Sequence, residues 1–435
     1  MKRTYICHIT QLKQAFLVLD NFKKQRMMLP HREGEETAAS NSTSTPILSI
    51  LDLPPEVMYM IFSYCDAPHL VTSVQYVCNS WHELLQAVHV WKGRRLIFGR
   101  DMPCHELMSY IRCAPSIDAI SYTYTSCHRF VPCLITNCYN LSWLKLHGDF
   151  FVPYSLLKNL INLQHLDLDL RWKFERKQDH DPDLTGISSV SSLQTLIVRN
   201  FNYHEKFVIE CIKNCPNLRH IFMSKVEAIE YYVDPEKVEE GINSSSNQLE
   251  TVYVFGAQSV GRELLELVAK PDYRGLRSLV LKPNDYTDYD FTNILFRDKF
   301  PEMVTLDIGY SNLVTDSSMP LLVNCCPKLK NLCLCRCNIG DAALKLFLKK
   351  LPSLERLNLH GTLVSSELLH FFPSSFPNLK ALNLCACRLV HQINLLPLLD
   401  ALPSIMILDR RGDFLGGNRD RKMNWPFLPV RNALA

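Results

Sequence analysis

The sequence of 435 residues has almost no net charge and no long apolar run. Its 47 basic and 44 acidic side chains leave a formal charge of +3, which does not suggest a protein that neutralises nucleic-acid phosphates or an anionic membrane surface. It contains no stretch of about 18 or more consecutive apolar residues, so no segment is predicted to span a membrane. We therefore expect neither nucleic acid nor a membrane among the partners.

The motifs of common catalytic sites are also missing. There is no H-E-x-x-H and no G-x-S-x-G motif. The stretch Gly256-x-x-x-x-Gly261-Arg262-Glu263 resembles a phosphate-binding loop only superficially, because it lacks the Lys and the Ser or Thr that would reach phosphate and magnesium. We predict that the chain is not an enzyme and needs no cofactor.

The 17 cysteines are numerous and odd in number, and the first residues lack the pattern of a secretory signal. We therefore expect reduced thiols, mostly buried, in a cytoplasmic or nuclear protein. The run Cys333-x-Cys335-x-Cys337 raises the question of zinc. On a strand, Cys333 and Cys335 would share one face while Cys337 takes a buried turn position, so we predict no metal site.

An apolar spacing L-x-x-L-x-L recurs twelve times at intervals of about 22 to 31 residues. This period is typical of leucine-rich repeats, with two longer exceptions, and predicts an α/β solenoid of about twelve strand–helix repeats with a curved parallel sheet. A solenoid is usually a binding surface rather than a catalyst. The spacings start at Ile117, Leu141, Leu163, Leu193, Leu218, Leu249, Leu276, Met303, Leu329, Leu354, Leu379 and Ile405.

Prolines and polar inserts divide the repeats. Seven of the spacings are preceded by a proline two residues earlier, which should end the returning helix: Pro115, Pro216, Pro301, Pro327, Pro352, Pro377 and Pro403. The two longest intervals contain the polar inserts Arg171–Asp183 and Tyr231–Asn247, which we expect to be loops. The last spacing ends in Arg410, as suits a terminal capping repeat.

Before the repeats lies a block of different character. Leu53-Pro54-Pro55-Glu56 should begin a first helix, Asp66-Ala67-Pro68 a second, and Asn79 or Ser80 a third. We divide the chain into an extension and linker (1–45), the helical block (46–95), a connecting segment (96–115), the repeats (116–410) and a tail (411–435). The block is too small to bury all of its apolar residues, so several should face a partner.

The block resembles an F-box through Leu53-Pro54-x-Glu56, Ile61-Phe62-Ser63-Tyr64, Asp66, Leu70, Val77-Cys78-x-x-Trp81 and Trp91. The repeats look like the cysteine-containing leucine-rich-repeat class, best seen from Leu313 to Cys337. The resemblance implies the substrate-receptor subunit of a Skp–cullin–F-box ubiquitin ligase, bound through a Skp-family adaptor to cullin and a RING subunit. It implies adaptor contacts at Leu53, Pro54, Glu56, Ile61, Phe62, Leu70, Val77, Cys78 and Trp81. The alternative is a repeat scaffold that no longer engages the adaptor.

In each repeat, the two residues that flank the central apolar strand position should point to the concave sheet face. Aromatic and charged side chains there suit recognition of a protein substrate, whose identity stays open. Candidate substrate-binding residues are Trp143, Lys145, His165, Asp167, Phe222, Tyr253, Asp307, Arg356 and Asn358. The face has no dense arginine cluster of the kind that phosphate recognition would favour.

Overall fold

The computed structural model describes residues 53–99, 102–125, 130–149, 154–170, 184–200, 205–224, 248–255, 262–282, 286–297 and 299–416. The predicted extension, both polar inserts and most of the predicted tail lie outside these ranges. The chain forms two compact units, one of residues 1–122 with 129–143 and one of residues 123–128 with 144–435. We describe each unit separately.

The first unit begins with short helices and continues into a parallel strand pair. Its helices are α2 (Pro55–Ser63), α3 (Ala67–Thr72), η2 (Val74–Tyr76, a 3-10 turn), α4 (Asn79–Leu84), α5 (Val88–Trp91), α6 (Cys104–Cys113) and α7 (Phe130–Asn137). Strand β1 (Arg95–Phe98) pairs in parallel with β2 (Ala119–Thr125), with Leu96 opposite Ile120. The segment expected to connect block and repeats thus contributes most of a strand and a complete helix.

Local sequence explains where these helices begin and where one prediction was wrong. Helix α2 starts at Pro55, whose missing N–H costs nothing there, and the Asp66 carboxylate accepts the His69 N–H at 2.8 Å to begin α3. The apolar spacing of Leu70, Val71, Val74 and Val77 predicts a second helix that reaches Val77, but α3 ends at Thr72, because Ser73 leaves the helical region with φ −132° and ψ −54°. Val77 is therefore rotated off the buried stripe and is 55% exposed.

Hydrogen bonds join the helical block to the strand that follows it. The Arg94 guanidinium donates hydrogen bonds to the Phe62 carbonyl at 2.6 Å and to the Cys65 carbonyl. These two carbonyls lie at and just beyond the C-terminal end of α2. The buried Trp91 indole donates to the Leu85 carbonyl at 2.5 Å. The Gly93 N–H donates to the Asp118 carboxylate at 2.9 Å. The block and the first strands therefore belong to one compact unit.

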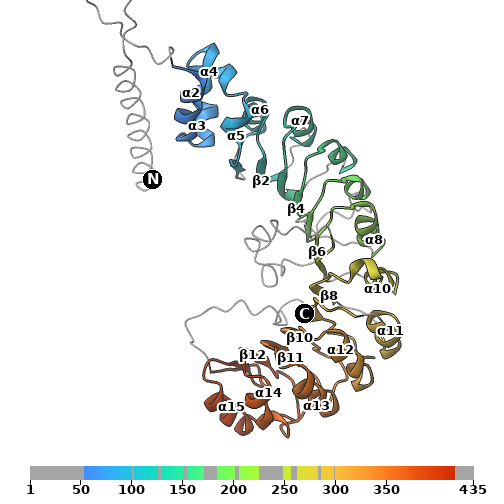
Figure 1. Cartoon of the computed structure of the whole chain (residues 1–435). Coiled ribbons are helices and arrows are strands. Elements are labelled where there is room, and N and C mark those ends of the chain that lie inside the picture. The colour runs from blue at the N-terminus through green and yellow to red at the C-terminus, as the bar shows by residue number, and fades with distance from the viewer. Residues whose placement is uncertain are drawn as a thin grey trace, which may run out of the picture. The chain divides into compact units, whose positions relative to one another are not determined.

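The strands of the second unit follow one another in chain order (Figure 1). They are β3 (Trp143–Asp149, which starts at the boundary), β4 (His165–Asp169), β5 (Thr195–Arg199), β6 (His220–Ser224), β7 (Thr251–Phe255), β8 (Ser278–Lys282), β9 (Thr305–Asp307), β10 (Asn331–Cys333), β11 (Arg356–Asn358), β12 (Ala381–Asn383), β13 (Met406–Leu408) and β14 (Phe414–Leu415). The twelve apolar spacings coincide with β2 to β13, which confirms the predicted fold class. Residues 414–415, expected in the tail, instead pair antiparallel with β13.

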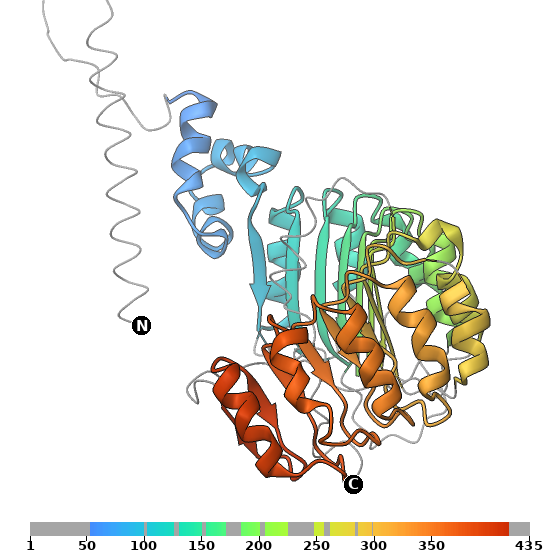
Figure 2. The ribbon, with the colours of Figure 1, turned by 60° about the horizontal axis from the view of Figure 1, so that its bottom comes forward.

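Helices and 3-10 turns return the chain along one side of these strands (Figures 1 and 2). The described ones are η3 (Tyr154–Asn159), η4 (Thr185–Ser189), α8 (Glu205–Asn214), α10 (Arg262–Val268), η6 (Pro271–Tyr273), α11 (Asp288–Asn293), η7 (Leu295–Arg297), η8 (Asp316–Ser318), α12 (Met319–Cys325), α13 (Asp341–Lys350), η9 (Leu369–Phe371), α14 (Phe372–Ser375), η10 (Gln392–Leu395) and α15 (Leu396–Ala401). Between them and the sheet, the leucines of the repeat spacing are almost completely buried.

The prolines end the return helices as predicted. Cys326, Leu351, Phe376 and Leu402 each precede a proline, and their ψ angles of 56° to 76° lie outside the helical region. Aspartates then connect consecutive repeats along the edge. Each accepts a backbone N–H of the next repeat at 2.9 Å: Asp288 from Thr315, Asp316 from Gly340 and Asp341 from Ser365.

Candidate protein-interaction surfaces

Three large apolar side chains of the described helical block are exposed to solvent. Met60 on α2 is 48% exposed, Tyr76 on η2 is 72% exposed and Val77 is 55% exposed. Pro54 and Glu56 at the start of α2 are exposed as well. Apolar groups left open on a block this small are the expected property of a docking surface.

The nine predicted adaptor contacts divide into core and surface. Ile61, Phe62 and Leu70 are 8%, 1% and 0% exposed, so they form the centre of the block rather than its surface. The Phe62 ring packs edge-on against Trp81 at 5.4 Å between ring centroids. The remaining residues reach solvent, with Leu53, Cys78 and Trp81 half-buried and Pro54, Glu56 and Val77 exposed.

Met60 and Tyr76 are exposed but are not among the adaptor contacts predicted from the sequence. Met60 lies beside Ile61 on α2, and only the fold decides which of two neighbouring apolar residues enters the core. Tyr76 lies on a 3-10 turn where a continuous helix was expected, so helical periodicity did not identify its exposed position.

On the sheet face opposite the helices, one row of side chains is in register across ten strands. We call it the central row: Asp167, Ile197, Phe222, Tyr253, Val280, Asp307, Cys333, Asn358, Asn383 and Leu408. None of its members is more than 3% exposed. The alternation of the strands was predicted correctly, but this burial was not.

The first part of the face is a charged network. The Asp167 carboxylate accepts a hydrogen bond from Arg199 at 2.8 Å and lies 3.4 Å from the Lys145 ammonium. The next carboxylate, Asp169, accepts from Asn200 at 2.6 Å and lies 4.0 Å from His147. Burial lowers the pKa of His147, which favours its neutral form. Asp167 is already paired with two cations, while the Lys145 and His147 side chains remain 27% and 23% exposed.

The middle of the face is apolar. Ile197, Phe222, Tyr253 and Val280 form a buried cluster, against which the partly buried Phe255 packs. His220 stacks on Phe222 with 6.4 Å between ring centroids. Burial lowers the pKa of His220 as well. Phe222 and Tyr253, which sequence analysis selects as target contacts, are therefore engaged within the molecule.

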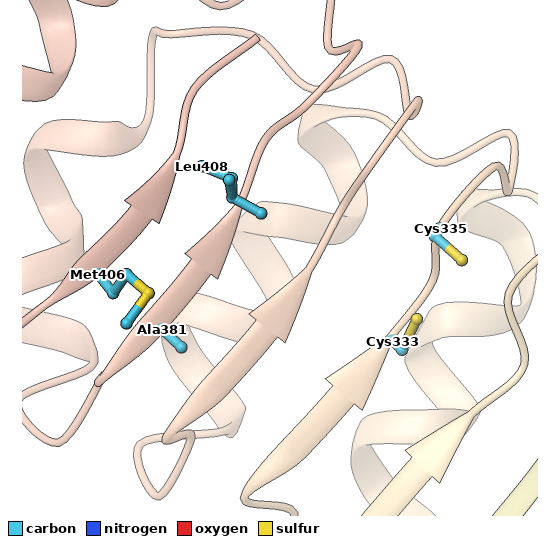
Figure 3. Packing of buried hydrophobic residues seen from close by; sticks show 5 residues of the cluster. All are labelled: Cys333, Cys335, Ala381, Met406 and Leu408. Carbon is cyan, nitrogen blue, oxygen red and sulfur yellow. The ribbon is translucent and has the colours of Figure 1, made fainter. Parts of the chain in front are cut away.

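The last part of the face combines a buried ion pair with thiols. The Lys282 ammonium lies 2.5 Å from the Asp307 carboxylate, and their side chains are 3% and 0% exposed. Lys282 also donates to the Cys333 thiol at 3.5 Å. Burial raises the pKa of Cys333 well above its usual range, so this thiol is protonated. Cys333, Cys335, Ala381, Met406 and Leu408 form an apolar cluster on the same face (Figure 3).

Several predicted contacts hold the backbone or a neighbouring side chain. The Asp307 carboxylate accepts the Gly309 N–H at 3.1 Å, and the Asn358 amide oxygen accepts the His360 N–H at 3.0 Å, so both stabilise the turn after their strand. Arg356 donates to the Asn331 amide at 3.0 Å. Arg356 is half-buried and keeps some contact with solvent.

Of the nine predicted substrate contacts, Trp143, Lys145 and Arg356 are partly accessible. His165, Asp167, Phe222, Tyr253, Asp307 and Asn358 are buried. The Arg95 guanidinium lies over the Trp143 ring at 4.8 Å from its centroid, a cation–π contact within the first unit. Most of the predicted substrate contacts are therefore not accessible in this structure.

Comparison with known proteins agrees with this organisation. The F-box-like family matches residues 50–96, the segment that contains α2 to α5 and the start of β1. Among curated protein sequences, none matches the chain. The chain carries an F-box-like domain. The strand register shows that leucine-rich repeats follow this domain.

Solved structures similar to the chain include leucine-rich-repeat proteins. An internalin from Listeria monocytogenes is 16% identical, with 78% of this chain and 93% of that chain covered and a TM-score of 0.44. A chain of the yeast Rad7–Elc1 complex is 15% identical, with 82% and 93% covered and a TM-score of 0.42. A leucine-rich-repeat protein from Leptospira interrogans is 14% identical, with 78% and 97% covered and a TM-score of 0.40.

The cysteines and helices add two observations about the described residues. Fourteen cysteines of the described ranges are free thiols, and the described residues contain no group of three or more His, Cys, Asp or Glu side chains placed to hold a metal ion. Cys337 donates to the Ile308 carbonyl at 3.5 Å from its buried position after the strand. None of the described helices has the length and apolarity required to cross a bilayer.

Proposed function

We propose that this protein is the substrate-recognition subunit of a Skp–cullin–F-box ubiquitin ligase. The F-box-like domain docks on a Skp-family adaptor, which links it to cullin and a RING subunit. The leucine-rich repeats bind a target protein for ubiquitination and proteasomal degradation. The observation that carries this proposal is that the F-box-like match, residues 50–96, contains the helical block that leaves Met60, Tyr76 and Val77 exposed.

The chemistry of the exposed groups supports docking to a protein. Tyr and large aliphatic side chains contribute most when they enter apolar pockets of a partner, and the rim around them excludes water. The contact between the buried Phe62 ring and the half-buried Trp81 ring joins α2, which carries Met60, to α4, which follows Val77. The surface is therefore supported by a packed core, which reduces the ordering that binding requires.

The proposed mechanism is positional and requires no covalent chemistry by this chain. Binding the target beside the conjugating enzyme raises the effective concentration of target lysines and orients them. The Arg94 hydrogen bonds to the end of α2 support this mechanism, because they hold the adaptor-binding block against the first strand pair. Movement of the block relative to those strands would reduce the benefit of tethering.

The proposed experiment is affinity purification of the full chain from cells, followed by mass spectrometry. We compare the unaltered chain with a Tyr76→Ala/Val77→Asp variant and with Ile97→Asp. Ile97 is a matched control, because it is a 74% exposed aliphatic residue in the same compact unit but lies on β1, outside the helices.

We expect adaptor and cullin to co-purify with the unaltered chain and with Ile97→Asp. Both should be lost from the Tyr76/Val77 variant, while target proteins bound by the repeats are retained. Absence of the adaptor from the unaltered chain would refute the ligase assignment. The remaining interpretation would then be a leucine-rich-repeat scaffold that does not engage an adaptor.

A further inference from the structure

Two cysteines lie together where strand β10 ends, and the proposed function does not use them. Cys333 is the last residue of β10 and Cys335 follows two positions later, so both side chains lie on the same face of the sheet (Figure 3). Their thiol groups are joined by a hydrogen bond. Cys337 instead donates to the Ile308 carbonyl at 3.5 Å. We call Cys333 and Cys335 the dithiol pair.

A lysine ammonium lies beside both sulfur atoms. The Lys282 ammonium, from β8, donates to the Cys333 sulfur at 3.5 Å and also forms a hydrogen bond with Cys335. The Asp307 carboxylate on the intervening strand β9 holds this ammonium at 2.5 Å. A cation in this position favours the thiolate form of a cysteine, and the thiolate is the form that reacts as a nucleophile.

The two thiols differ in their tendency to ionise. The hydrogen bond from Cys333 and the charge of Lys282 lower the pKa of Cys335, whereas burial raises the pKa of Cys333. Cys335 is 4% exposed and Cys333 is 0% exposed, so a small molecule from solvent meets Cys335 first. Cys335 is therefore the nucleophile of the pair, and Cys333 keeps its proton.

The preceding repeat leaves room for the Cys335 sulfur. Gly309 lies opposite Cys335 in the register of β9 and β10, and a Cβ atom on Gly309 would collide with that sulfur. The backbone on both sides of this glycine is paired with the dithiol pair. The Ile308 N–H donates to the Cys333 carbonyl at 3.2 Å, and the Tyr310 N–H donates to the Cys335 carbonyl at 2.6 Å. The two thiols are therefore held on a fixed backbone.

We propose that the dithiol pair is a site of reversible oxidation by hydrogen peroxide, which converts it to a disulfide. The Cys335 thiolate attacks one peroxide oxygen, the O–O bond breaks, and the hydroxide that leaves takes a proton from solvent to become water. The Cys333 sulfur then attacks the sulfenic acid formed on Cys335, its proton joins the departing hydroxyl group, and a second water leaves. In total, two thiols lose two electrons and two protons, and one peroxide becomes two waters.

The spacing of the pair permits this bond and makes it easy to break. Two steps of extended chain place the Cα atoms about 6.6 Å apart, near the upper end of the range of about 4.4–6.8 Å found for disulfides. A disulfide near that limit is strained, and strained disulfides are readily reduced by other thiols. We therefore expect a dithiol reductant to reverse the oxidation.

The same Cys-x-Cys spacing two repeats later provides a matched control. Cys385 lies in register with Cys335 across the strands between them. Its neighbour Cys387 donates to the Leu359 carbonyl at 2.9 Å, and burial raises the pKa of Cys387. We call Cys385 and Cys387 the control pair. Because Cys387 is protonated and bound to the backbone, the control pair should oxidise more slowly.

The experiment follows both pairs in one sample of the purified full chain. The chain is exposed to hydrogen peroxide, its remaining thiols are alkylated in urea, and it is digested with trypsin. Because trypsin cleaves after Lys and Arg, the peptide Asn331–Arg336 contains the dithiol pair and no other cysteine, and Ala381–Arg388 contains the control pair alone. Mass spectrometry distinguishes a disulfide, which lacks both alkyl groups and two hydrogen atoms, from two alkylated thiols.

We expect the disulfide to form at least about tenfold faster in Asn331–Arg336 than in Ala381–Arg388, and dithiothreitol to reverse it. Cys335→Ser should abolish it. Cys333→Ser should stop the reaction at a sulfenic acid on Cys335, which dimedone traps. Each serine variant changes one atom, so these two variants keep the test valid if a larger change prevents folding.

The contribution of the lysine is tested separately. Lys282→Met/Asp307→Asn removes both charges and should slow disulfide formation at least about tenfold. Lys345→Met, which replaces an exposed lysine on α13, should leave the rate unchanged. Equal rates in the two variants would refute activation by Lys282.

Two outcomes overturn the proposal. Equal oxidation of the two peptides would show that peroxide does not select the dithiol pair. Dimedone labelling of Cys333 in Cys335→Ser, at the rate seen for Cys335 in Cys333→Ser, would show that the pair has no distinct nucleophile. The test uses the purified chain alone, so its result does not depend on whether the chain binds an adaptor.

Discussion

The buried ion pair between Lys282 and Asp307 gives the sharpest quantitative prediction. Asp307→Asn removes the negative charge but keeps an oxygen that can accept the Gly309 N–H, so it tests the pair without deleting the turn contact. The Lys282 side chain is 3% exposed and would lose the carboxylate that lies 2.5 Å from its ammonium group. Leaving one charge of a buried pair uncompensated typically costs about 3–5 kcal/mol.

The assay is urea unfolding of the full chain followed by circular dichroism, with the slope compared between variants to check that they unfold alike. The matched control is Glu302→Gln, which breaks the Lys328–Glu302 pair. Its atoms lie 2.7 Å apart, but its side chains are 58% and 49% exposed. Water and salt already screen that pair, so the control should leave the unfolding midpoint unchanged.

A second variant separates charge from packing. Lys282→Met/Asp307→Asn removes both charges, so it should cost clearly less than Asp307→Asn alone. If Asp307→Asn proves as mild as Glu302→Gln, the argument that burial makes the Lys282–Asp307 pair costly to break is wrong.

Three further predictions concern the repeats. Asp341→Ala should destabilise the chain by about 1–3 kcal/mol in urea unfolding, because the carboxylate accepts the Ser365 N–H at 2.9 Å and its hydroxyl at 2.6 Å; Asp341→Asn, which keeps an acceptor, should lose less. Burial lowers the folded-state pKa of His220 below the unfolded value of about 6.5, so its contribution is present above that pH and is lost as pH falls through this region. The thermal midpoint should therefore drop between about pH 7 and 5, and His220→Phe should reduce the drop; an equal drop in the variant would exclude this histidine as its cause. Gly309→Ala should lower the thermal midpoint because its Cβ would collide with the Cys335 sulfur, and adding Cys335→Ala should recover part of the loss; no recovery would point to the backbone instead.

The repeat architecture was predictable because its signal is periodic. Each spacing except the last places apolar residues at the same three positions, and the strands β2 to β13 followed from it. Strand β1 lacks the pattern, because Gly93 stands three residues before Leu96 where the repeats have an apolar residue. Strand β14 is two residues long and depends on pairing with β13, which no local pattern encodes.

For the candidate surfaces, the sequence predicted the sheet face on which the strand side chains lie, but not how exposed those side chains are. Strand alternation correctly placed Asp167 and Asp307 on the sheet face. Their partners Arg199 and Lys282 come from other repeats, so sequence spacing alone did not show that both carboxylates are neutralised. In the helical block, the break at Ser73 determines which apolar residues face solvent, and helical periodicity across it led to the wrong helix end.

The central claim is that the F-box-like domain docks on a Skp-family adaptor. The most direct measurement is calorimetric titration of a purified adaptor into the purified full chain and into its Val77→Asp variant. Val77 is 55% exposed on the block, and loss of a central apolar contact at a binding hot spot typically costs about 2 kcal/mol or more, which exceeds tenfold in Kd. The account predicts a saturable complex for the unaltered chain and a Kd at least tenfold weaker for the variant. No binding by the unaltered chain, or equal affinity of the two, would contradict it.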